Sequence, residues 1–269
     1  MNRLRRDTVG LGLRAAHYRD FLTGEPEVEY VEVITENFLG PAGVPARVLE
    51  RVAARCPVVL HGVGLNLLGP DPLDEAYLDS VCRLADRIDA PYVSDHLCWT
   101  GAGARSHHDL LPSPFLPELV SRAAERAHHV QRRLGRPFGL ENLSSYVAFR
   151  ESSMTEWAFY ASVVREAGCH FMLDVNNIWV SGTNHGFAPQ HYLDAIDFTR
   201  VLQVHVAGHD ASGPIVVDTH DRTVSESVWQ LLVEAWRRGG PFPVLLERDA
   251  RVPPLPALLA EAQRARSLR

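Results

Sequence analysis

Residues 138–141, Phe-Gly-Leu-Glu, form a short apolar run that ends in a carboxylate, and five further runs share this form. They are VVLH at 58–61, YVSDH at 92–96, FMLD at 171–174, LQVH at 202–205 and VLLE at 244–247. Successive runs end 31 to 45 residues apart, which leaves room for a strand, a returning helix and two loops. The spacing therefore predicts parallel strands whose C-terminal ends gather metal-binding residue types around one site.

Eight segments in all have the short, Val-, Ile- and Leu-rich character of strands that are buried on both faces. They are residues 9–14, 28–34, 58–64, 92–99, 138–143, 170–175, 201–206 and 244–247. Helical periodicity is clearest at 45–55, 74–88, 117–134, 155–166 and 225–238. Eight strands alternating with helices in 269 residues predict a single (β/α)8 barrel domain over 1–269. The Gly10-Leu11-Gly12 element lacks the third glycine of a dinucleotide-binding fingerprint and indicates close packing in the first strand.

Three long stretches are predicted to be irregular, and each follows a strand on the face where barrel enzymes build their sites. They are residues 99–114, 175–190 and 207–224. The first contains His107, His108 and Asp109, and the other two carry further histidine, asparagine and aspartate residues. We expect these polar clusters to belong to the site rather than to surface insertions.

The composition excludes several chemistries and partners. All 27 basic residues are arginine, so neither a Schiff-base lysine nor a P-loop lysine is present. A net charge of −6 without a long basic block argues against nucleic acid as the main partner. The sequence also has no G-x-S-x-G element of the kind that carries a hydrolase nucleophile.

Cysteine usage and the N-terminus suggest a cytoplasmic protein. Cys56, Cys82, Cys98 and Cys169 form no C-x-x-C pair, so we expect small buried residues rather than disulfides or a thiolate zinc site. No apolar stretch approaches the roughly 20 residues that would cross a bilayer, so we expect no membrane association. The basic N-terminus has no apolar core of a secretory signal.

The strand-end residues suit a metal centre with nitrogen and oxygen ligands. Ionised Glu141, Asp174 and Glu247 would be costly to bury without a cation, and imidazole with carboxylate suits zinc, iron, manganese or cobalt. The ligand-grade residues exceed what one ion needs, so two or three ions are expected. Candidate supporting residues are Asp95 before His96, Asn142 after Glu141, and Asn176 and Asn177 after Asp174. Glu32, Glu36 and Asn37 at or beyond the second strand are either solvated or in contact with substrate.

Nine sequence strings resemble one known family over nearly the whole chain. The strings are HGVGLN (61–66), VSDHLCW (93–99), HDLLP (108–112), LENLSSYVAF (140–149), MTEW (154–157), LDVNNIWVSGTNHGF (173–187), QVHVAGH (203–209), VDTHDRTVSESVW (217–229) and LLERD (245–249). They are similar to those of the multinuclear non-heme iron-dependent oxidative enzymes, which include the iron subunit of methanobactin biosynthesis. The resemblance implies a xylose-isomerase-like barrel that holds two or three mixed-valent irons and uses O2.

The family's activity would be oxidative modification of cysteine in a ribosomally made precursor peptide, begun by removal of hydrogen from the cysteine β-carbon. A small partner protein usually presents the peptide. By this resemblance, His61, His96 and Glu141 hold one iron, and Glu141 or Asp174 holds a second with His205 and Glu247. A third, looser position would use Asn177 or Asp174 with His185, Asp218 and His220. Glu141, Asp174, His96 and His209 would serve catalysis, and His108 would be auxiliary.

Two positions depart from the family's pattern. Arg248 stands where the family commonly has tryptophan, so substrate contacts near the eighth strand are expected to differ. The loop after the third strand reads GLNLLGP in place of a serine-containing version. Neither departure removes a candidate ligand.

Three other functions remain open on the residues alone. A divalent-metal sugar isomerase or epimerase would share the barrel and the ligand ring, although such enzymes often use a lysine that this chain lacks. A zinc phosphodiesterase acting on DNA would need a basic face. A metal-bound scaffold without catalysis would have less need to keep a ligand at all six strand ends.

Overall fold

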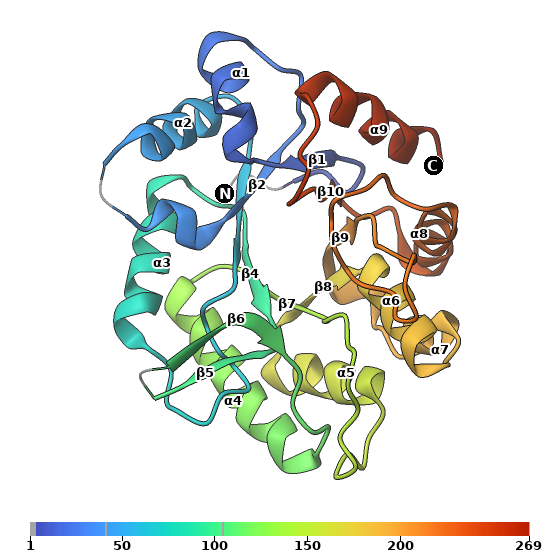
Figure 1. Cartoon of the computed structure of the whole chain (residues 1–269). Helices are drawn as coiled ribbons and strands as arrows, with labels where there is room; N and C mark the ends of the chain where they lie inside the picture. The colour runs from blue at the N-terminus through green and yellow to red at the C-terminus, as the bar shows by residue number, and fades with distance from the viewer. Residues whose placement is uncertain (1–3, 41, 104, 269) are drawn as a thin grey trace.

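The computed structural model describes residues 4–40, 42–103 and 105–268, with the side chain of His108 outside the described part. In these residues eight parallel strands close into a barrel in the order β1-β10-β9-β8-β7-β4-β3-β2, with helices around the outside (Figure 1). The strands are β1 Val9–Gly12, β2 Val31–Ile34, β3 Val58–Gly62, β4 Val93–His96, β7 Phe138–Glu141, β8 His170–Asp174, β9 Val201–Val206 and β10 Val244–Leu246. All eight predicted strands are confirmed, mostly with shorter bounds, and the predicted (β/α)8 fold is correct.

The helices follow the strands in alternation. They are α1 Tyr18–Thr23, α2 Val44–Ala53, α3 Glu75–Arg87, α4 Pro117–Leu134, α5 Glu156–Ala167, α6 Val175–His185, α7 Pro189–Asp194, α8 Glu226–Gly239 and α9 Leu255–Ser267, with short 3-10 turns at Ala15–His17, Thr35–Phe38 and Phe198–Arg200. The side chains of Thr155 and Ser225 cap α5 and α8, and Gly135 and Gly168 take φ of 61° and 66° after α4 and α5. These four residues explain why the helix bounds could be predicted closely.

The barrel interior is apolar toward the N-terminal ends of the strands and polar toward their C-terminal ends. Tyr30, Val59, Tyr92 and Leu245 form a buried cluster of their own. Residues two apart on a strand share a face, so the next inward position after Val59 is His61, and β10 likewise continues inward beyond Leu245. The apolar cluster thus forms the floor beneath the strand-end residues.

Two glycines of β1 allow close packing, as the Gly10-Leu11-Gly12 element predicted. A Cβ on Gly10 would lie 2.5 Å from the ring of Tyr30, and a Cβ on Gly12 would lie 2.7 Å from the guanidinium of Arg14. The rigid ring of Tyr30 is fully buried, so Gly10 has no room for a side chain, whereas a side chain at Gly12 would displace the end of the buried Arg14 side chain.

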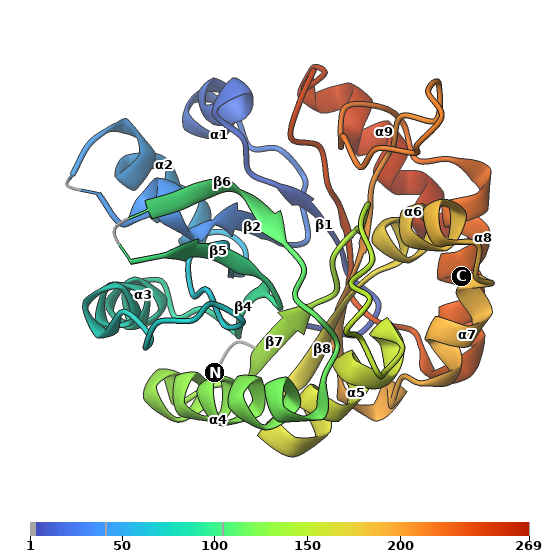
Figure 2. The same ribbon diagram turned by 60° about the horizontal axis from the view of Figure 1, so that its bottom comes forward.

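Two stretches predicted to be irregular are regular. Residues 99–114 contain a hairpin of β5 (Trp99–Ala102) and β6 (Arg105–Leu111), in which Gly103 takes the positive φ of 57° that follows β5 (Figure 2). Residues 175–190 contain α6 and the start of α7, because the carboxylate of Asp174 accepts the backbone N–H of Asn177 and caps a helix. Local capping therefore outweighed the polar composition of this stretch.

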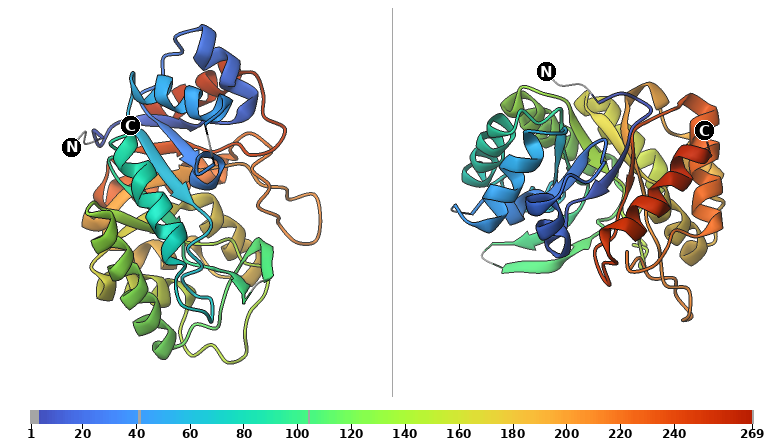
Figure 3. Two further views of the ribbon diagram at one scale, coloured as in Figure 1. Left: turned by 90° about the vertical axis from the view of Figure 1, so that its left-hand side faces the viewer. Right: turned by 90° about the horizontal axis from the view of Figure 1, so that it is seen from above.

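The third stretch, 207–224, is irregular as predicted apart from a bridge between Asp210 and Val217. It projects from the same end of the barrel as the β5–β6 hairpin (Figure 3). In the described residues, no helix has the length and apolar character to span a membrane. The four cysteines are unpaired, and Cys98 and Cys169 are fully buried.

Candidate metal centre

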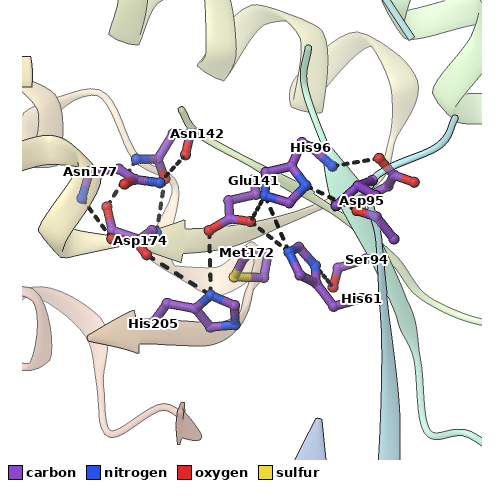
Figure 4. A network of polar contacts seen from close by, with 12 residues as sticks. His61, Ser94, Asp95, His96, Glu141, Asn142, Met172, Asp174, Asn177 and His205 are labelled. Carbon is purple, nitrogen blue, oxygen red and sulfur yellow. Dashed lines mark hydrogen bonds and ion pairs between the residues drawn. The ribbon is translucent and has the colours of Figure 1, made fainter. Parts of the chain in front are cut away.

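The parallel register brings the strand-end residues together. His96 at the end of β4 lies opposite Glu141 at the end of β7, and Asp174 at the end of β8 lies opposite His205 of β9. Figure 4 shows these four side chains and His61 gathered into one polar group. Parallel pairing therefore assembles the ring that the sequence spacing suggested.

Three donor atoms converge in a first cluster. Oε2 of Glu141 lies 2.8 Å from Nε2 of His61 and 2.8 Å from Nε2 of His96, and the two nitrogens are 3.4 Å apart. Ligand atoms at about 2.1 Å from one ion, with angles of about 90–110°, are about 3.0–3.4 Å apart. The observed spacing is close to that of three ligands on a single cation.

The other ring nitrogens fix how these histidines face the cluster. Nδ1 of His96 lies 2.9 Å from the carbonyl oxygen of Gly62, and Nδ1 of His61 lies 2.9 Å from Oγ of Ser94. Because a carbonyl only accepts, Nδ1 of His96 carries a proton and its Nε2 offers a lone pair in the neutral ring. Burial lowers the pKa of His96, but Glu141 outweighs it and raises that pKa to about 9. The geometry therefore demands a cation, either a proton or a metal ion, between the ring and the carboxylate.

A second cluster surrounds His205. Its Nδ1 lies 3.4 Å from Oε1 of Glu141, 3.2 Å from Oε2 of Glu247 and 3.9 Å from Oδ2 of Asp174. Its Nε2 lies 3.0 Å from the buried carboxylate of Glu32, which holds the Nε2 proton and turns Nδ1 toward the three acids. Glu141 presents one oxygen to each cluster, so it is placed to bridge two ions.

A third cluster contains His220, Glu247 and Asp249. Nδ1 of His220 lies 3.4 Å from Oε2 of Glu247 and 3.1 Å from Oδ2 of Asp249. Its Nε2 lies 2.6 Å from Oδ1 of Asp218. Asp218 and His220 therefore meet as the resemblance implied, but Asp249 joins His220 in place of Asn177 or Asp174.

His185 does not reach this third cluster. Its Nε2 lies 2.8 Å from Oγ of Ser145, and its side chain is exposed. The reason is α6, which starts beside Asp174 and carries His185 eleven residues, or about 16 Å, along its axis. The structure thus corrects the expectation that His185 lies among the metal ligands.

The buried acids of the centre fit a bound metal. Oδ1 of Asp174 accepts the N–H of Asn177 at 2.7 Å, whereas Oδ2 is buried without a hydrogen-bond partner among the described residues. Burial, together with the charges of Glu141 and Asp218, raises the pKa of Asp174 well above its usual range. A cation would satisfy the orphaned oxygen and relieve this repulsion, and the nitrogen and oxygen donor set accepts iron among other transition metals.

Asn142 and Asp95 support the centre through the backbone. The Asn142 side chain donates to the carbonyl of Asp174 and accepts its N–H, each at 2.9 Å, which joins the ends of β7 and β8. Asp95 was expected to orient a histidine ring, but its carboxylate accepts the backbone N–H groups of His96 and Leu65. The alternation of β4 explains this, because Ser94 and His96 face the cluster and Asp95 faces away.

Three further predicted residues lie away from the cluster. Glu36 accepts the N–H of Val63 at 2.8 Å and the hydroxyl of Tyr77, and Asn37 is exposed. Arg248 was expected near substrate, but its guanidinium lies 3.0 Å from Glu261 of α9. Glu247 faces inward, so its neighbour on the chain faces outward.

His209 contacts the centre only indirectly. Its Nδ1 lies 2.7 Å from Oδ1 of Asn176, whose Nδ2 donates to Asp218 at 2.7 Å. Asn176 therefore links His209 to the third cluster. The catalytic role predicted for His209 stays a prediction, and the side chain of His108 lies outside the described residues.

A cavity of about 270 Å3 opens above the clusters. His61, Glu141 and Glu247 line its base, while Leu110 of β6 and Tyr146 of the loop after β7 line its wall. Asn177 lines it as well, with its Oδ1 buried and without a hydrogen-bond partner in the described chain. The space suits one side chain and adjoining backbone rather than a folded protein.

Four residues of the centre were missed or left undecided from the sequence. Glu32 could have been found, because in the run VEVI (31–34) it alternates with valines and must face the barrel interior. Asp249 gave only a weak signal, two residues beyond Glu247 on an irregular segment. Ser94 could have been found in the same way, because it lies two residues before His96 on one strand. Arg14 gave no signal, since the inward face of its predicted strand was unknown.

Comparison with known proteins places the chain in a defined group. Residues 8–269 match the family described as "RiPP precursor modification enzyme MbnB/TglH/ChrH". A UPF0276 protein of Anaeromyxobacter sp. (strain Fw109-5) is 48% identical over 256 residues, covering 95% of this chain and 90% of the relative. A UPF0276 protein of Caulobacter vibrioides (strain NA1000 / CB15N) is 47% identical over 262 residues, covering 97% and 94%.

Solved structures of similar fold have other activities. The 3-keto-D-glucoside 4-epimerase YcjR of E. coli aligns with a TM-score of 0.60 at 14% identity, covering 97% of this chain and 99% of that one. Endonuclease IV of Thermus thermophilus aligns with a TM-score of 0.59 at 17% identity, covering 97% and 98%. At such identities the likeness establishes a common barrel of the xylose-isomerase type and nothing about the reaction.

Proposed function

This chain belongs to the family of RiPP precursor modification enzymes, and we propose that it oxidises a cysteine of a ribosomally made precursor peptide at a centre of two or three irons. The observation that carries the proposal is the sharing of Glu141 and Glu247 among three clusters of metal-ligand type. A single-ion enzyme would have no use for carboxylates that serve two clusters each. Iron there would supply the one-electron chemistry with O2 that removal of hydrogen from the cysteine β-carbon requires.

The protein's own residues would hold and orient the metal centre. His61, His96 and Glu141 would hold the first ion, and Glu141, Asp174, His205 and Glu247 the second. Ser94, the Gly62 carbonyl and Glu32 fix the three rings so that one nitrogen of each faces its cluster. These partners reduce the reorganisation needed when the metal binds.

The surroundings of the cavity favour a peptide substrate. Tyr146, Val147, Ile215 and Val217 are large hydrophobic residues that stay exposed, and they lie on the two loops that contribute Tyr146 and Asp218 to the cavity lining. Exposed apolar groups gathered at one mouth mark a binding surface. We propose that the segment around the modified cysteine lies across these loops, with the thiol directed to the clusters, and that a small partner protein presents the peptide.

The cavity is less suited to the other activities of this barrel type. Among the described residues that line the cavity there is no arginine or lysine that would bind the phosphates of DNA. Sugar epimerisation would leave the hydrophobic mouth without a role. Neither alternative gains support from the fold, because the epimerase and nuclease likenesses are far below 25% identity.

Metal content and thiol dependence test the proposal. Protein reconstituted without oxygen should retain two to three irons per chain by elemental analysis. Addition of a cysteine-containing precursor peptide should produce a new visible absorption band that its Cys→Ser version does not produce. On admission of O2, mass spectrometry should find the peptide modified at cysteine. Stoichiometric zinc together with peptide turnover that is independent of iron would overturn the proposal.

A further inference from the structure

Arg14 is a buried cation at the edge of the metal centre. It follows β1, its side chain is 10% exposed, and its guanidinium packs against Gly12, where any Cβ would collide with it. Gly12 of the Gly10-Leu11-Gly12 element thus leaves space for an arginine rather than for a nucleotide. Burial of a guanidinium is costly unless carboxylates surround it.

Two carboxylates of the third cluster surround Arg14. Its Nε donates to Oδ1 of Asp249 at 2.7 Å, and its Nη2 contacts the same oxygen and lies 3.4 Å from Oε1 of Glu247. Among the ion pairs of the described residues, no other arginine contacts an acid of the three clusters. Arg14 is therefore the fixed positive charge of the centre.

The two acids divide their oxygens between Arg14 and His220. Oε1 of Glu247 and Oδ1 of Asp249 face the guanidinium, whereas Oε2 and Oδ2 lie 3.4 and 3.1 Å from Nδ1 of His220. A cation held by His220 would thus share both acids with Arg14. Asp249 makes the closer contacts with Arg14 and belongs to the third cluster alone.

We propose that Arg14 limits the affinity of the third cluster for its metal ion. A guanidinium keeps its charge at all pH values the protein survives, so it repels a nearby divalent ion permanently. It also neutralises part of the charge that would otherwise attract the ion. The inference rests only on the metal-binding part of the proposed function, and it can hold or fail whether or not cysteine is oxidised.

Titration of metal-free protein with Mn2+ alone, with free Mn2+ followed by electron paramagnetic resonance, tests the inference. In Arg14→Gln the third equivalent should bind at least about tenfold more tightly than in the unaltered protein, because a positive charge is removed. In Arg14→Lys, which keeps the charge but not the planar fork, the third equivalent should change by less than about threefold. Arg251→Gln, which removes an exposed arginine paired with Asp221 instead, is the matched control and should leave all equivalents unchanged.

The direction of the change in metal affinity shows whether the charge of Arg14 repels the third ion or whether Arg14 helps to assemble the third cluster. Loss or weakening of the third equivalent in Arg14→Gln would mean that Arg14 assembles the cluster, and an unchanged titration would mean that it only fills space; either result overturns the proposal. Circular dichroism of each metal-free variant checks folding. Should Arg14→Gln fail to fold, Arg14→Met offers a second neutral side chain of similar length over Gly12, with the same expected tightening.

Discussion

Oε1 of Glu141 lies 3.4 Å from Nδ1 of His205, while the other oxygen of the same carboxylate lies between His61 and His96. One side chain at the end of β7 thus connects two halves of the barrel mouth. Three protonatable rings around this acid lower the pKa of Glu141 well below its usual range, against the effect of burial. The carboxylate is therefore held ionised and ready for metal.

Glu141→Gln should remove the bridge and much of the bound metal. A neutral amide offers one oxygen instead of two, so we expect metal content to fall in both clusters and peptide turnover to drop at least about 100-fold. Elemental analysis and mass spectrometry of the peptide measure these effects. Glu50→Gln, the same change on an exposed residue of α2, should behave as the unaltered protein. Full metal content in Glu141→Gln would show that the centre lies elsewhere.

Glu32→Gln should weaken the second cluster selectively. The Glu32 carboxylate holds the Nε2 proton of His205 at 3.0 Å, and loss of its charge makes His205 a poorer ligand. We expect metal affinity at this cluster to fall about 10–100-fold, while the cluster of His61 and His96 changes little. Metal titration measures the affinities of the two clusters separately. An equal loss of affinity at both clusters would argue against separate sites.

The barrel and most of the centre could be predicted because strand periodicity fixes both. Parallel strands of similar length place their last inward residues at one level, so His61, His96 and His205 came together as the spacing indicated. These contacts between the ends of different strands could therefore be predicted without knowledge of the tertiary structure.

Residues beyond the strand ends could not be placed in this way. His185 is carried away by α6, a helix whose start depends on the side chain of Asp174 acting as a cap. Arg14 and Asp249 lie 235 positions apart, and they meet only because β1 pairs with β10 to close the barrel. Such contacts depend on closure and on local capping, which periodicity alone does not reveal.

Val147→Asp should impair peptide recognition without disturbing the fold. Val147 is 57% exposed and follows Tyr146, which lines the cavity, so a charge there costs little stability but repels an apolar peptide side chain. We expect KM for the precursor peptide to rise about five- to tenfold, with kcat unchanged, since a peripheral contact is worth about 1 kcal/mol. Val44→Asp, the same substitution on an exposed valine at the start of α2, is the control. Equal kinetics for the two variants would show that these loops do not contact the peptide.

Glu156 should make stability depend on pH. Burial raises the pKa of this carboxyl to about 7, although Tyr192 donates to its Oε1 at 3.2 Å. Because the folded-state pKa exceeds that of the unfolded chain, the folded state binds more protons between about pH 4.5 and 7, and stability falls as pH rises through this window. The loss should reach up to about 3 kcal/mol by pH 8.

Urea unfolding of the protein and of Glu156→Gln at pH 5 and pH 8 should show the variant gaining relative stability at the higher pH. Glu166→Gln, an exposed residue of the same helix, should not gain it, and parallel behaviour of all three proteins would refute this role for Glu156.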